Sequence, residues 1–129
     1  MSLDALVADV AACATPATLV NPLRDRADDL DRPDAPVIRR ANLLAYLAAR
    51  PQPRAVLAGE AMGWRGGRFS GIAFTSERQL AAWGAPFAAS SLKAGGWTES
   101  SATIIHGVLD ELDAEHEVVL WNTVPFHPH

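Results

Sequence analysis

The sequence predicts an α/β fold built around a parallel sheet. Two short apolar runs, Arg54–Ala58 and Glu117–Trp121, have the form of buried strands, and a helical pattern lies between them. Strand, loop, helix and strand follow one another in the order of a βαβ unit, whose ligand loops follow the carboxyl ends of the strands. The expected class is therefore α/β, with ligand loops at one edge of the sheet.

Two helices are expected before the first strand. Ser2 can cap the first helix, which has its apolar residues on one face and is stopped by Pro16. Residues 21–36 are rich in Asp, Arg and Pro and lack periodicity, so they predict an exposed connection. The second helix is expected from about residues 34–36 to Arg50, because an acid and a proline suit its first turn.

A glycine-rich loop follows the first predicted strand. Residues 59–71, GEAMGWRGGRFSG, contain five glycines, which suit close approach of the backbone to a ligand. No GxGxxG or P-loop pattern is present there, which argues against dinucleotide or ATP binding. The elements expected next are a helical turn at Gln79–Trp83, a loop at Gly84–Gly96, and a helix capped by Thr98 or Ser100 that runs through Leu112.

The composition is that of one globular domain, with 49% hydrophobic and 20% charged residues. No apolar run approaches the roughly 18 residues that span a bilayer, and the N-terminus lacks signal-peptide features, so we expect a cytoplasmic protein. The single cysteine, Cys13, excludes a disulfide framework and an iron–sulfur cluster, and we expect it in the core.

The net charge of −4 is unevenly distributed. Residues 1–34 hold seven acids and three bases, whereas the rest of the chain is neutral. In the central loop region basic residues outnumber acids, an excess that suits either contact with phosphates or a solvated loop. These residues are Arg65, Arg68, Arg78 and Lys93, against Glu77 and Glu99.

Three motifs occur in order: GEAMG (Gly59–Gly63), GIAFTSE (Gly71–Glu77) and LWNTVPFHPH (Leu120–His129). Together they resemble bacterial members of the uracil-DNA glycosylase superfamily, in its GEAPG-type branch but without the iron–sulfur cysteines. The resemblance covers about residues 54–129 of a single domain whose residues 1–53 are a helical lead-in. It implies a three-layer αβα fold with a central parallel sheet and no cofactor.

The resemblance also implies a pocket for a base flipped out of DNA. Phe74 would stack on the uracil, and the Asn122 amide would donate its NH2 to O4 and accept the N3 proton. Backbone without bulky side chains at Gly59, Ala61 and Gly63 would lie against the base or the attacking water. An ordinary core phenylalanine and a turn-forming asparagine are the alternative interpretations.

The first motif departs from the classical enzymes. Ala61 stands where they have a water-activating Asp. Gly63 stands where they have a thymine-blocking Tyr, and the absence of that Tyr predicts an open pocket that admits other bases. Glu60 becomes the candidate for positioning water or stabilising an oxocarbenium-like sugar, or else it anchors the loop. Met62 stands at a position that is usually Pro.

The superfamily's second catalytic motif supplies a histidine and lies well after the Asn strand. His127-Pro128-His129 follows Asn122 too closely to be that motif, and it is not expected to bind a metal. Two strands make a thin sheet, so we expect either part of a longer product with further strands or a shortened product that keeps the pocket and has lost the histidine loop.

The leading hypothesis is a monomeric, metal-free hydrolase of base excision repair. It would excise uracil or a related damaged base from DNA by base flipping, with Arg65 and Arg68 on DNA phosphates and without contact with a membrane. Two alternatives stay open. One is a non-catalytic nucleic-acid or nucleobase-binding module that lacks the histidine loop, and the other is a small α/β domain that docks partners.

Overall fold

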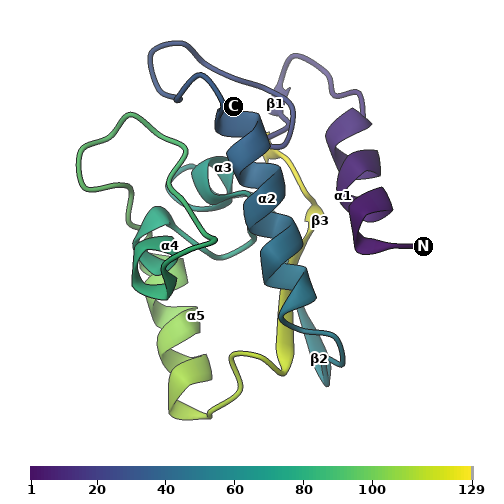
Figure 1. Ribbon diagram of the computed structural model, residues 1–129, viewed down its shortest axis with the longest axis vertical. Helices are drawn as coiled ribbons and strands as arrows, with labels where there is room; N and C mark the ends of the chain where they lie inside the picture. Colours follow the sequence, from purple (N-terminus) through teal and green to yellow (C-terminus); the bar gives the residue numbers. More distant parts are fainter. Residues whose placement is uncertain (129) are drawn as a thin grey trace.

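The computed structural model describes residues 1–128, which form a mixed α/β structure of helices and a small parallel sheet (Figure 1). No helix in this range is long and apolar enough to cross a membrane. In chain order the elements are α1 (Leu3–Ala12), β1 (Leu19–Val20), α2 (Ala35–Ala48), β2 (Ala55–Ala61), α3 (Gly67–Ser70), α4 (Glu77–Trp83), α5 (Ser100–Glu111), β3 (Val118–Val124) and β4 (His127–Pro128).

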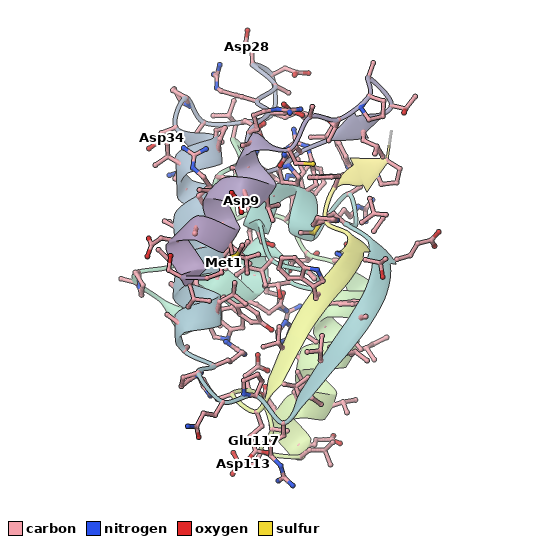
Figure 2. All side chains as sticks on the ribbon, turned by 90° about the vertical axis from the view of Figure 1, so that its right-hand side faces the viewer. Met1, Asp9, Asp28, Asp34, Asp113 and Glu117 are labelled. Atoms are coloured by element: carbon pink, nitrogen blue, oxygen red, sulfur yellow. The ribbon has the colours of Figure 1, made fainter. Side chains whose placement is uncertain are left out.

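The parallel pair consists of β2 and β3, the two strands that the sequence predicts. Their register places Leu57 opposite Leu120 and Gly59 opposite Asn122. Because the strands are parallel, both end at the same edge, and Figure 2 shows β3 rising from Glu117 toward the end of the molecule that carries Asp28. A short antiparallel pair, β1 and β4, lies at this end and was not predicted.

Helices lie on both sides of the strand pair. Figure 1 shows α1 on the right of the strands and α4 and α5 on the left. The hydroxyl of Tyr46, in α2, accepts a hydrogen bond of 2.8 Å from Leu120 N and so covers the outer edge of β3. The buried apolar core comprises Val7, Leu23, Leu43, Tyr46, Leu47, Ile72, Ala73, Leu80, Leu109 and Leu120.

β2 is more exposed than its apolar sequence predicts. Val56 is 61% exposed and Leu57 is 41% exposed. Within residues 1–128, β2 pairs only with β3, and along its other edge Figure 2 shows side chains but no neighbouring strand. Parallel strands are normally covered on both faces. β2 is not covered in this way within the described residues, so the prediction of a buried strand is wrong for β2.

The connection between α1 and α2 is only partly exposed, contrary to the prediction. Asn21 Nδ2 donates to Val10 O at 2.8 Å and so closes the last turn of α1. Leu23 belongs to the core, and Asp31 is fully buried. Cys13, which we expected in the core, lies just beyond α1 and is exposed.

The buried carboxylate of Asp31 joins two buried arginines. Oδ1 accepts a hydrogen bond from Arg39, in α2, and Oδ2 accepts one of 3.0 Å from Arg68, in α3. Burial, and beyond it the neighbouring Arg68 guanidinium, lowers the pKa of Arg39 to about 10. The ion pairs therefore hold three segments together. These are the connection between α1 and α2, α2 itself, and the end of the glycine-rich loop.

We expect Asp31→Asn to lower the free energy of unfolding by about 3–5 kcal/mol, because it leaves two buried guanidinium groups without a counter-charge. Urea unfolding followed by circular dichroism measures this loss. Asp28→Asn is the matched control, since Asp28 pairs with Arg26 but its side chain is 92% exposed, and it should cost less than about 0.5 kcal/mol. Equal losses in the two variants would contradict this assignment.

Candidate functional site

The structure brings together three of the residues that the sequence singles out. A Cβ atom at Gly59 would overlap the Phe74 ring, and it would lie only 2.8 Å from Oδ1 of Asn122. Gly59 and Asn122 are register partners on neighbouring strands, whereas Phe74 comes from the turn between α3 and α4. The phenyl ring and the amide thus meet over a backbone position where only glycine fits.

The backbone holds Phe74 in a strained conformation. Its φ angle is 52°, which side-chain-bearing residues seldom adopt and which occurs preferentially at functional sites. Ser70 Oγ donates to Thr75 O at 2.6 Å, and Ile72 N donates to Ser70 Oγ at 3.0 Å. These buried bonds fix the turn on both sides of Phe74 and so offset the cost of its conformation.

A polar chain behind this turn was not predicted. The Thr75 hydroxyl donates to Ala73 O and contacts Nε2 of His106 at 2.9 Å, while Nδ1 of His106 lies 3.0 Å from Glu115. The order resembles a hydroxyl–imidazole–carboxylate triad, but Thr75 is fully buried and its hydroxyl also lies within hydrogen-bond distance of Ala73 O. These hydrogen-bonded side chains therefore connect α5 to the Phe74 turn, and the Thr75 hydroxyl is not exposed to a ligand.

Met62 occupies the space beside the Asn122 amide. Its sulfur lies 3.2 Å from Asn122 Nδ2, and its side chain fills the place that a Cβ at Gly67 would take. Asn122 is 2% exposed as a result. A base can reach the amide only if the Met62 side chain moves, which suits the three rotatable bonds of methionine.

Glu60 and Ala61 are not arranged as predicted. Successive side chains of a strand point to opposite faces, so Glu60 lies on the face of the sheet away from Asn122, and it is exposed. It is not in place to position water beside a base at Asn122. Gly59 and Ala61 pair with β3 in the parallel ladder, so both positions belong to the strand and not to the loop that follows it.

The space beside Gly63 is filled rather than open. A Cβ there would lie 3.0 Å from the carboxylate carbon of Glu99, and one at Gly66 would lie 2.8 Å from the same atom. The sequence alone indicates no role for Glu99 beyond a local negative charge. The signal that could have revealed it is the pair of glycines three residues apart, which leaves room for a side chain from elsewhere in the chain.

The two arginines predicted to contact DNA phosphates differ in exposure. Arg65 is exposed and, with Arg78 and Glu99, lines a cavity of about 320 Å³. Arg68 is 2% exposed and bonded to Asp31, so the structure does not place it where it can bind a phosphate. Glu77 is also buried, where Ser90 N and Ser91 N both donate to it.

The C-terminal histidine of the described range supports the same loop. Nδ1 of His127 donates to Met62 O at 2.8 Å, and its ring centre lies 5.5 Å from that of Trp64. His129 lies outside the described residues. His127 thus holds the backbone at Met62, beside the Asn122 amide.

Comparisons of the chain with protein-family models, curated proteins and solved structures find no match.

The Glu115 carboxylate should make stability depend on pH. Burial acts to raise its pKa, but the hydrogen bond from His106 and the nearby charges of His106 and Arg50 outweigh burial and lower it below the ordinary value of 4.5. The unfolded chain then binds more protons near that pH, so stability is complete above it and is lost as the pH falls through the folded-state pKa. Thermal unfolding between pH 3 and 7 should show this slope.

Glu115→Gln should flatten that slope and lower the melting temperature at pH 7. Glu117→Gln is the control, because Glu117 is half-exposed and lies 3.8 Å from Arg54. An unchanged pH slope in Glu115→Gln would show that this carboxylate does not carry the dependence.

Proposed function

We propose that this protein is a DNA glycosylase of the uracil-DNA glycosylase type, which hydrolyses the bond between uracil, or a related damaged base, and deoxyribose. One observation carries the proposal: Gly59, Phe74 and Asn122, which the motifs single out at separate places in the sequence, meet at one point in space. An aromatic face beside a fixed amide suits a flat base that offers a hydrogen-bond acceptor next to a donor.

Recognition in this site would depend on the Asn122 amide. Its NH2 group donates to O4 of uracil, and its oxygen accepts the N3 proton. Cytosine presents the reverse pattern and would leave a buried donor and acceptor unpaired, at a cost of about 1–3 kcal/mol for each group. Stacking on Phe74 adds affinity for any base without choosing among them.

The arrangement of the elements is consistent with the proposed family. The site lies where β2 and β3 end, the edge at which α/β sheets bind their ligands. Helices on both sides of the strands suit a three-layer αβα architecture of the glycosylase kind (Figure 1). Arg65, exposed on the glycine-rich loop, is the candidate contact for a DNA phosphate.

A non-catalytic module that binds nucleobases or nucleic acid is the second candidate. The position of Glu60 favours it, because the one carboxylate of the first motif lies on the wrong face to assist hydrolysis. Binding of single-stranded DNA that weakens steeply with salt but releases no base would support this alternative.

Excision from an end-labelled oligonucleotide containing a single uracil tests the proposal. The wild-type protein should release uracil and leave an alkali-sensitive abasic site, whereas Asn122→Ala should be at least about 100-fold slower because two hydrogen bonds to the base are lost. Thr123→Ala is the matched control, since Thr123 is exposed and adjacent to Asn122 but points to the other face of the strand.

Thr123→Ala should excise uracil at the wild-type rate. If the wild-type protein releases no base from strands that contain uracil or a deaminated purine, the glycosylase proposal fails. Excision that is unaffected by Asn122→Ala would place base recognition elsewhere in the molecule.

A further inference from the structure

We infer that Glu99, and not Glu60, is the carboxylate that faces the deoxyribose of the bound nucleotide. The inference rests on the proposed function and assigns one residue of its chemistry. It begins from the glycine-rich loop, where Gly63 and Gly66 both leave their side-chain space to the carboxyl group of Glu99.

Glu99 has no evident structural task at this position. It precedes α5 as the N-cap residue, yet its side chain makes no capping hydrogen bond and turns to the loop instead. Among the described residues, burial alone perturbs its carboxylate, with no hydrogen bond or ion pair to offset it, and raises its pKa. A partly desolvated carboxylate without a partner is costly, and such groups occur preferentially at functional sites.

The other carboxylates near the site differ from Glu99 in this respect. Glu77 is fully satisfied by donors from Ser90, Ser91 and Trp97. Glu115 is engaged by Arg50 and His106 behind the Phe74 turn. Glu115 also lines a cavity with Arg78, but its carboxylate already has these partners, whereas Glu99 lines a cavity with Arg65 and Arg78 and its carboxylate has no hydrogen-bond partner among the described residues.

Glu99 is connected to the proposed base site through the glycine-rich loop. The Glu99 carboxylate lies against Gly63. The preceding residue, Met62, contacts the Asn122 amide through its sulfur. Arg65 and Arg78 line a cavity of about 320 Å³ together with Glu99. In the proposed complex the base lies at Asn122 and its phosphate at these arginines, and the inference assigns the sugar between them to the position beside Glu99.

In this place Glu99 has a defined chemical role. When the bond between C1′ and the base breaks, its electron pair leaves with the base, and positive charge develops on the sugar. The ionised carboxylate stabilises that charge and accepts a proton from the water whose oxygen bonds to C1′. The base anion takes up a proton from solvent, and Glu99 returns its proton to solvent.

Binding of charged and neutral sugar mimics tests the inference without requiring turnover. One strand carries a protonated pyrrolidine in place of a single deoxyribose, and a second strand carries the neutral tetrahydrofuran ring at that place. Fluorescence anisotropy should show that the wild-type protein binds the pyrrolidine strand at least about tenfold more tightly. Glu99→Gln should abolish this preference while it leaves the affinity for the tetrahydrofuran strand unchanged.

Glu60→Gln is the control, and it should keep the wild-type preference because Glu60 lies on the opposite face. Glu99→Gln should not melt below the wild-type temperature, since it removes an unpaired charge from a partly buried place. A preference that survives Glu99→Gln, or is lost equally in Glu60→Gln, overturns the assignment of Glu99 even where the wild-type protein excises uracil. Binding of neither strand counts against both this inference and the proposed function.

Discussion

The pairing of Asp31 with Arg39 and Arg68 sets the position of the glycine-rich loop. Arg68 lies near the end of the glycine-rich loop, which begins at the carboxyl end of β2. Arg39 belongs to α2, a long helix packed in the core. Arg39 also donates to Ser90 Oγ at 2.9 Å, and that hydroxyl donates to Phe69 O at 2.6 Å. A loop with so many glycines would otherwise sample many conformations, and this buried network selects one of them.

The fold could be predicted where the signal is local. The period of apolar residues and the flanking prolines locate α1 and α2, and the two apolar runs locate β2 and β3 within a few residues. The network around Asp31 could not be predicted, because its partners lie 8 and 37 residues away and the segment has the polar composition of an exposed loop. The exposure of β2 also escaped prediction, since composition does not reveal which elements cover a strand.

For the site too, local sequence motifs could be recognised, whereas contacts that depend on tertiary packing could not. Phe74 and Asn122 lie in motifs and meet as the resemblance implies, whereas the expected role of Glu60 ignores the alternation of side chains along β2. The burial of Arg68 and the arrival of Glu99 beside Gly63 depend on tertiary packing. A motif thus identifies residues that lie near a site, and only the packing shows which of them face it.

The Asn122 amide is covered by other side chains. Met62 covers the amide of Asn122, and the ring of Phe74 lies against Gly59. Under the proposed function, a base enters only when the Met62 side chain leaves the amide, and stacking and two hydrogen bonds would replace the buried contacts that are lost. The backbone beneath Met62 is held by Phe126 O and by His127, so the side chain can move while the loop stays in place.

Nuclear magnetic resonance of the Asn122 side chain can show whether its amide recognises the base. The two side-chain N–H signals of Asn122 can be assigned by their loss in Asn122→Ala and followed in ¹⁵N-labelled protein. A strand with 2′-fluoro-2′-deoxyuridine, whose glycosidic bond resists cleavage, should shift both signals, and the same strand with cytosine should leave them in place. Signals that stay unmoved by the uracil strand at saturation, or that respond equally to cytosine, would contradict base recognition by Asn122.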